Sequence, residues 1–580
     1  MFSARGRTAA MFALYGVLST IFCWPLFEFP NGLGISDWDQ HFFYYGSVLK
    51  NAVEYAQLPF WNPWYCGGNV LWQNPQIAVL SPVYPLTSVM SLALAMKINI
   101  VLHYWVGFIG MHLLLTRILQ LSYLPLVVYL ASIFTLGGGI VLHLNAGHSV
   151  FLPAFYLPLL LFLFLRCLRT ERPRDALPAA AVLALTIYNG GLHIVPIVVV
   201  AIGGIGLTAA VVRRRWRPLL LGVLVGIAGV GYTAPKLLPI TLFVGSDQFS
   251  DERTGLEVLD RMNVRMMLRS YLDPYQNRSL RVGDFQRHGW FEYGDYIGGL
   301  AAILTAASIV WILMHWKHAD NWLGLSFAVT TVLLLLFSAG EFSRFAPASL
   351  TAHVPLFSSF RVPSRYTIAV PLLAALTIGW AARSMAMETA LAGGARLFVG
   401  LVCAMAALQL LAENRVHFNG VFPIAPLDHG FRLLTGPNTF EIDQTTSPYG
   451  SSSPMLRALV NGQSFYHCYE SLQLRHTADA DHAIVFGDDN SRISDTTFSP
   501  NRIEFSVVNG RQPSRITLNQ NYARGWKSSA GPMTPDPRDG KPSVVLAPGQ
   551  AGKYAFVFVP PGLWLGLGVF ASAMIATWLL

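Results

Sequence analysis

The sequence predicts a polytopic α-helical membrane protein with a β-rich domain outside the membrane near its C-terminal end. Of its 580 residues, 53% are hydrophobic and 12% are charged, a composition typical of multi-pass membrane proteins. The basic residues fall mainly in short gaps between apolar runs, as the positive-inside rule requires. Residues 499–529 instead alternate apolar and polar positions, which indicates strands. Membrane topology therefore explains the net charge of +9, and we do not expect nucleic-acid binding.

The N-terminal segment predicts the first membrane span. Arg5 and Arg7 precede an apolar run with no A-x-A-like cleavage site, so we expect a retained signal anchor with a cytoplasmic N-terminus. The apolar segment 77–96 is interrupted by Pro82 and Pro85, which predicts a re-entrant or interfacial segment instead of a full span.

About twelve spans follow from the length of roughly 20 apolar residues that a membrane-crossing helix needs. With segment 77–96 left out, the arginine clusters at 166–174 and 213–217 fall on the cytoplasmic side. The predicted spans are 9–29, 98–118, 122–142, 149–166, 176–190, 192–212, 218–239, 295–315, 321–339, 366–383, 396–412 and 562–580.

The same topology places the long polar segments on the outer side of the membrane. They are the first loop, 30–76, and the segments 245–293, 340–365 and 413–560. We therefore expect a transmembrane domain at 1–412, an external β-sandwich-like domain at 413–560, and a last transmembrane helix at 561–580.

The strand pattern is clearest in the second half of the external domain. Ile503, Phe505 and Val507 share one face, and Ile516 and Leu518 repeat the pattern after a turn. Further strands are expected at 543–546 and 554–559, whereas residues 413–483 are rich in loop residues and are expected to pack on the membrane body.

An amphipathic helix is predicted at 256–272. Arg261, Arg265 and Arg269 recur every four residues beside methionines, so the segment could lie in the membrane interface with its cations toward lipid phosphates. A solvated helix face is the alternative interpretation.

The five cysteines show no CxxC spacing, which argues against a metal or redox motif. Cys66 and Cys468 both fall outside the cytoplasm, where a disulfide is chemically allowed. We favour two free thiols, since their separation cannot be read from the sequence.

Asp37 and Asp39 are the most prominent acids of the first loop, and they stand in an aromatic surrounding. One of them could be a general base, the two could bind a divalent cation such as Mg²⁺ or Mn²⁺, or one could orient the other. The alternative is that both cap the helix that begins near His41, since Asp is a favoured N-cap residue.

Candidate cations occur at three other external positions. Lys236 lies near the outer end of a predicted span, where it could bind a ligand or extend to the interface. Arg361 and Arg365 lie where a loop meets a span, and their guanidinium groups suit bidentate phosphate binding. Histidines His143, His148 and His193 occupy nearby external turns, but their spacing does not support a zinc site.

An ordered set of motifs over nearly the whole chain resembles the YfhO-like bacterial membrane proteins, which are similar to the GT-C superfamily of integral-membrane glycosyltransferases. The motifs are DWDQ, LPFWNPWYCGG, GHSVFLPAFYLPL, YNGGLH, APKLLPI, EYGDYIGGL, PLFSSFRVPSR and QNYARGW.

The resemblance implies inverting sugar transfer from a polyprenyl-phosphate-linked donor to a glycan, lipid or protein acceptor, on the outer side of a bacterial cytoplasmic membrane. It implies an acidic base in the first external loop, with Asp39 preferred to Asp37 because the aromatic run HFFYY follows it. It also implies donor-phosphate binding by Arg361, Arg365 and Lys236. The expected substrate pocket consists of Trp38, Gln40, His41, Trp61, Asn62, Trp64, His148 and His193.

Two other functions fit the same composition. A lipid-linked saccharide transporter or flippase would share the cationic cavity, although no internal repeat supports it. A non-enzymatic scaffold for envelope assembly would tolerate the loss of both aspartates.

Overall fold

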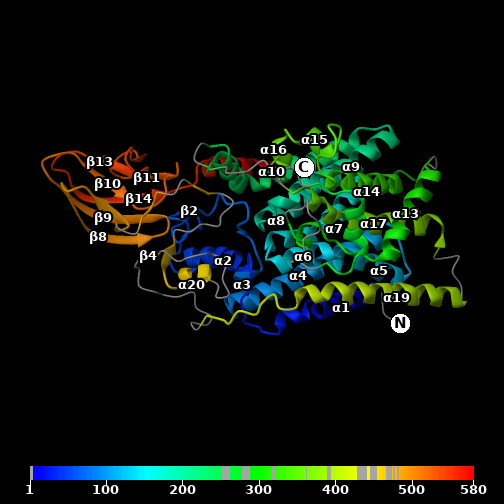
Figure 1. Ribbon diagram of the computed structural model, residues 1–580. Coiled ribbons are helices and arrows are strands. Elements are labelled where there is room, and N and C mark those ends of the chain that lie inside the picture. The colour runs from blue at the N-terminus through cyan, green and yellow to red at the C-terminus, as the bar shows by residue number, and fades with distance from the viewer. Residues whose placement is uncertain are drawn as a thin grey trace.

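The computed structural model confirms a helical membrane body joined to a β-sandwich (Figure 1). It describes residues 4–246, 249–250, 261–276, 288–316, 321–358, 360, 362–387, 393–427, 441–443, 454–465, 473–474, 477–479 and 482–580. Within these residues, eight helical segments are long and apolar enough to cross a membrane, and three apolar helices are shorter.

The helices of the body follow the predicted spans in order. They are α1 (Ala4–Cys23), α4 (Leu92–Leu113), α5 (Leu124–Thr135), α6 (Gly138–Ala146), α7 (Leu157–Thr170), α8 (Leu177–Tyr188), α9 (Val195–Arg213), α10 (Arg217–Val244), α13 (Gly299–Met314), α14 (Trp322–Ser338), α17 (Val370–Ser384), α19 (Gly393–Arg415) and α21 (Leu563–Leu579). The predicted span 122–142 is divided into α5 and α6 by a break at residues 136–137.

Most of the segment with two prolines, 77–96, forms no long helix: residues 77–91 contain only the short helix α3 (Val83–Leu86). Its last five residues, however, belong to α4, which begins at Leu92, six residues before the predicted start at residue 98. Ser91 explains that earlier start, because its hydroxyl accepts a hydrogen bond from the backbone N–H of Leu94 and caps the helix.

The two ends of the helical body differ in charge. Arginines at the C-terminal ends of α7, α9 and α17 bind groups at the ends of neighbouring helices. Arg213 pairs with Glu171 at 2.6 Å, and Arg383 donates to the carbonyl of Leu119 at 3.0 Å. The first loop contacts the C-terminal end of α6, where the backbone N–H of Asp37 donates to the carbonyl of Ala146 at 3.3 Å.

The first loop forms the connection between the body and the sandwich. It contains α2 (Trp38–Val53), β1 (Trp61–Asn62) and β2 (Asn69–Val70), and α2 lies beside α20 (Pro454–Val460) (Figure 1). Short helices lie between the long ones: α11 (Val264–Leu272), α12 (Trp290–Tyr293), α15 (Pro347–Thr351) and α16 (Pro355–Ser358). The 3-10 turn η7 (Pro363–Ala369) leads into α17.

The sandwich consists of two antiparallel sheets of four strands. Their orders are β12-β13-β10-β7 and β11-β14-β9-β8. The strands are β7 (Val485–Gly487), β8 (Ser491–Ser499), β9 (Arg502–Asn509), β10 (Ser514–Leu518), β11 (Trp526–Ser528), β12 (Thr534–Pro535), β13 (Pro542–Leu546) and β14 (Ala551–Phe558). Short pairs outside it join β3 (Phe249–Ser250) to β6 (Gln473–Leu474) and β4 (Glu441–Asp443) to β5 (Gln463–Phe465).

The alternation read from the sequence matches the burial in the sandwich. Ile503, Phe505 and Val507 are 1–2% exposed, and Ile516 and Leu518 are fully buried between the sheets. An inward residue every second position explains why the periodicity predicted this domain.

Trp61 ties the first loop into the sandwich core. Its indole packs against Trp526 and Phe558, and its Nε1 donates to Oε1 of Gln520 at 2.9 Å. Next to it, Asn521 donates from its backbone N–H to the carbonyl of Gly67 at 2.8 Å. The chain approaches this closely because Gly68 has a φ of +98°, where a Cβ would lie 2.1 Å from Gln520.

One cysteine prediction is corrected. Cys66 is disulfide-bonded, contrary to the free thiol that we favoured. Cys23, Cys167 and Cys403 are free, and Cys468 lies outside the described residues. The sequence could not reveal this bond, because separation along the chain does not determine the distance between two cysteines in space.

Candidate functional site

The candidate site is a cluster of charged and imidazole side chains where α2, α6, α12 and η7 meet. We call it the His–Glu cluster, and it consists of Asp37, His143, His148, Glu292 and Arg365. The turn after α6 builds it: Gly147 ends the helix at a φ of +101°, and a Cβ there would lie 2.4 Å from the backbone nitrogen of Trp38. The missing side chain lets the start of α2 approach the end of α6.

Two hydrogen bonds hold the start of α2 in this position. The backbone N–H of Asp37 donates to the carbonyl of Ala146 at 3.3 Å, and Nε1 of Trp38 donates to the carbonyl of Leu144 at 2.8 Å. As a result, Oδ2 of Asp37 lies 3.1 Å from Nε2 of His148. Asp37 occupies the N-cap position of α2, but its side chain makes no capping hydrogen bond, so the capping interpretation does not hold for it.

The two histidines of the cluster contact each other. Nδ1 of His143 lies 3.0 Å from Nδ1 of His148, and the His143 ring stacks on Phe151 with centroids 3.8 Å apart. His193 also faces Phe151, at 6.3 Å between centroids. The Phe151 ring therefore lies against both His143 and His193, which are far apart in the sequence.

Buried Glu292 and partly buried Arg365 form a bidentate ion pair. Nε and Nη2 of Arg365 donate to the two carboxylate oxygens at 2.7 and 2.5 Å, and the guanidinium also lies over the Phe151 ring at 5.3 Å. Burial by itself would raise the pKa of Glu292, but the charge and hydrogen bonds of Arg365, together with the two histidines, hold that pKa well below its usual range. The glutamate is therefore a carboxylate at neutral pH.

The segment around the amphipathic helix α11 packs on α12, the helix that carries Glu292. Met262 and Met266 pack on Trp290 and Tyr293, which flank Glu292 in α12. The Arg269 guanidinium lies 5.1 Å from the centre of the Trp290 ring. The helix begins only at Val264, so residues 261–263 of the prediction are not helical, and residues 256–260 lie outside the described residues. The methionines of this segment pack on protein.

His41 belongs to the surroundings of the cluster. It is 3% exposed, and burial lowers its pKa to about 4 despite the attraction of Asp37, with His148 adding to the lowering. His41 is therefore a neutral imidazole at physiological pH.

Asp39 lies elsewhere and caps a different helix. Its Oδ2 accepts the N–H of Met455 at 2.9 Å and its Oδ1 accepts the N–H of Leu456 at 3.1 Å, at the start of α20. Burial raises the pKa of Asp39 to about 6, and the two backbone hydrogen bonds limit the rise. Because both oxygens serve α20, the structure gives no support to Asp39 as the preferred base, or to Asp37 and Asp39 as a shared metal-binding pair.

Lys236 also has a structural role in these contacts. It is fully buried, and its ammonium donates to the carbonyls of Trp72 and Asn74 at 2.6 and 3.0 Å. Trp72 returns a hydrogen bond to the carbonyl of Pro235 at 2.8 Å. These bonds fasten the first loop to α10, so we do not extend the donor-phosphate role to Lys236.

The remaining residues of the expected pocket pack inside the protein. Trp38 is fully buried against Phe42 and Phe422, and Trp61 lies in the sandwich core. Other members are also 7% exposed or less: Gln40, Asn62 and Trp64. Arg361 lies outside the described residues.

Sequence reasoning missed Glu292. The motif that contains it, EYGDYIGGL, was noted for its resemblance, but its acids were assigned no role. The available signal was an acid directly before an apolar span, in a chain with few acids.

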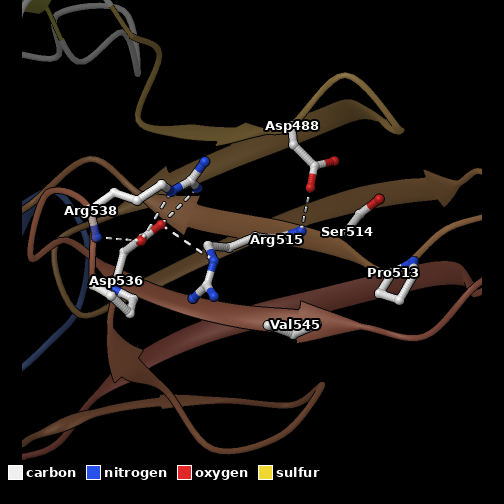
Figure 2. Close-up of a pocket in the computed structure, with 8 residues that line it drawn as sticks. Asp488, Pro513, Ser514, Arg515, Asp536, Arg538 and Val545 are labelled. Carbon is white, nitrogen blue, oxygen red and sulfur yellow. Dashed lines mark hydrogen bonds and ion pairs between the residues drawn. The ribbon is translucent and has the colours of Figure 1, made fainter.

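A separate pocket of about 330 Å³ lies on the sandwich surface. Figure 2 shows that both of its acids are already bonded. Asp536 forms ion pairs with Arg515 at 3.3 Å and Arg538 at 2.8 Å, and Asp488 accepts a hydrogen bond from the backbone N–H of Arg515 at 2.9 Å. The pocket therefore offers mainly charges that are already paired.

Comparison with known proteins provides little further assignment. No protein-family model matches the chain, and no curated protein matches it. Among solved structures, it is similar to the cryo-EM structure of arabinofuranosyltransferase AftD from Mycobacteria, with 13% identity and a TM-score of 0.41. That match covers 73% of this chain and 27% of the AftD chain, so the present chain spans about a quarter of the length of AftD. A likeness at this level does not transfer an activity.

Proposed function

We propose that the chain is a membrane glycosyltransferase of the GT-C type. It transfers a sugar, with inversion, from a polyprenyl-phosphate-linked donor to an envelope acceptor on the outer side of a bacterial cytoplasmic membrane. The observation that carries the proposal is the contact between Asp37 and His148 at 3.1 Å, in a cluster that also contains the Arg365–Glu292 ion pair. The resemblance of the ordered sequence motifs supports the reaction class.

Asp37 is the base in this proposal instead of Asp39. Its side chain is 21% exposed, whereas Asp39 is 3% exposed and serves α20. An imidazole N–H donated from His148 orients the Asp37 carboxylate toward an incoming hydroxyl. The acceptor hydroxyl transfers its proton to Asp37 while its oxygen bonds to the anomeric carbon.

The leaving group departs in the same step. The bond between the anomeric carbon and the phosphate oxygen breaks, and the phosphate keeps the electron pair. Arg365 stabilises the negative charge that develops on the phosphate, and Glu292 holds the plane of its guanidinium in a fixed direction. A single displacement gives inversion, so no covalent nucleophile is required.

The test is transfer from radiolabelled polyprenyl-phosphate sugars by membranes that contain the wild type, Asp37→Asn or Asp39→Asn. A positioned base contributes roughly 10²- to 10⁴-fold, so we expect Asp37→Asn to lower the rate by that factor at equal protein level. The Asp39→Asn variant is the matched control and should retain most of the rate per folded molecule.

Two outcomes would contradict the proposal. Equal rates for the wild type and Asp37→Asn would remove Asp37 from the reaction. Movement of intact lipid-linked sugar across the membrane without transfer, measured in proteoliposomes, would instead favour the transporter.

A further inference from the structure

The His–Glu cluster contains a set of metal ligands that the spacing in the sequence did not reveal. One ligand atom each from His143, His148 and Glu292 lies within 4.8 Å of the other two. Two nitrogens bound to one tetrahedral Zn²⁺ at about 2.0–2.1 Å lie roughly 3.3 Å apart. The two Nδ1 atoms of the histidines are 3.0 Å apart, which is close to that separation.

Two of the three ligands, His148 and Glu292, already have an outer partner of the kind that metal sites use. A metal-binding histidine usually donates its second ring N–H to a carboxylate, and a ligating carboxylate is itself hydrogen-bonded. Here Nε2 of His148 faces Asp37 at 3.1 Å, which leaves its Nδ1 directed at His143. Arg365 orients Glu292, and the stacked Phe151 sets the plane of the His143 ring.

We propose that His143, His148 and Glu292 bind a divalent transition-metal ion of the zinc class. Two imidazole nitrogens and one carboxylate oxygen suit Zn²⁺, whereas Mg²⁺ and Ca²⁺ prefer oxygen ligands. Three protein ligands leave a fourth position open, as in catalytic zinc sites. The ion differs in class and in ligands from the Mg²⁺ or Mn²⁺ at Asp37 and Asp39 that the sequence suggested.

The charges of the site indicate what the open position would take. A divalent ion and Arg365 together exceed the charges of Glu292 and Asp37 by one positive charge. An anionic oxygen, such as that of a phosphate, balances this excess. This last step rests on the proposed function, whereas the metal site itself does not.

The experiment measures metal binding by the full chain, purified in detergent and stripped with a chelator. Zn²⁺ and Co²⁺ are added back separately, and bound metal per chain is determined by mass spectrometry after buffer exchange. The Co²⁺ form is also examined by visible absorption, because its d–d bands report the coordination geometry. We expect one ion per wild-type chain and a Co²⁺ spectrum of four- or five-coordinate type.

Variants then assign the ligands. His143→Gln and His148→Gln should each lose the bound ion, and Asp37→Asn, which removes only the outer partner, should weaken binding by about 10- to 100-fold. His482→Ala is the matched control, because His482 also pairs with a carboxylate, that of Asp479 at 2.8 Å, but on the sandwich. This variant should bind as the wild type does.

The wild-type titration decides the proposal even if a variant fails to fold. Binding of less than 0.1 ion per wild-type chain, or unchanged binding in both histidine variants, would overturn it. Metal binding without any sugar transfer would leave the site in place and reject the proposed function. Sugar transfer by a wild-type chain that binds no added ion would support the proposed function and overturn the metal site.

Discussion

Replacement of Asp39 by Asn tests the assignment of this residue as the cap of α20. In the wild type, burial raises the pKa of Asp39 from 3.8 to about 6. Its folded pKa is therefore above its unfolded one, so its contribution to stability is fully present below pH 3.8 and is lost as the pH rises through 6. At about 1.36 kcal/mol per pKa unit, the loss is roughly 3 kcal/mol.

The Asn side chain does not titrate and can accept only one of the two hydrogen bonds from Met455 and Leu456. The unmade bond costs about 1–3 kcal/mol at every pH. Asp39→Asn should therefore be clearly less stable than the wild type at pH 4 and close to it at pH 8.

The assay is thermal unfolding of both proteins in the same detergent from pH 4 to pH 8, followed by intrinsic fluorescence. The quantity of interest is the difference in Tm between wild type and variant, because other titrating groups cancel in it. A difference that stays constant over this range would refute the burial argument. A folded Asp39→Asn protein without transfer activity would refute its assignment as a cap only.

Three further perturbations test the site and the junction. Glu292→Gln leaves the Arg365 charge without its anion, which should cost about 3–5 kcal/mol of stability at neutral pH. Because the folded pKa of Glu292 is lowered, the wild type loses this stability as the pH falls below 4.5, and the difference in Tm between wild type and variant should narrow there. A difference that stays constant would contradict the ion-pair account. Gly147→Ala places a Cβ 2.4 Å from the backbone nitrogen of Trp38 at a φ of +101°. We therefore expect the free energy of unfolding in a denaturant titration to fall by about 1–3 kcal/mol, and sugar transfer to be slower. Wild-type values for both would show that the α2–α6 contact is not tight. In Gly68→Ala, the new Cβ would push into Gln520 and break the hydrogen bond between Gln520 and Trp61 of the first loop, which should speed proteolysis between the body and the sandwich. The control is Gly226→Ala, which has open space around its Cβ and should not change the rate of proteolysis.

Several helices and strands could be predicted because each of them follows from a local pattern of apolar residues along the chain. The apolar runs predicted the helices of the body in order. The break at Pro82 and Pro85 predicted that segment 77–96 forms no span, and this segment has no long helix as far as residue 91. The alternation at Ile503, Phe505 and Val507 predicted a buried sheet face. Helix starts were less accurate, as at α4, because a single capping hydroxyl shifts them.

The candidate site was predictable only in part. The sequence singled out Asp37, His148 and Arg365, which the structure brings together with His143 and Glu292. It could not distinguish Asp37 from Asp39, because the distinction depends on α20, more than 400 residues away. The aromatic residues of the first loop were taken as a substrate pocket, whereas Trp38 and Trp61 fill cores on either side of that loop.

The sequence by itself determined the fold class of this protein, because the length of apolar runs and the alternation of apolar and polar residues are local properties of the chain. Only the tertiary structure decided which polar groups share a site. That choice depends on where helix ends meet: Gly147 allows α2 to reach α6, and α12 then places Glu292 beside two histidines. Such meetings are contacts between distant segments, and no local pattern encodes the distance between them.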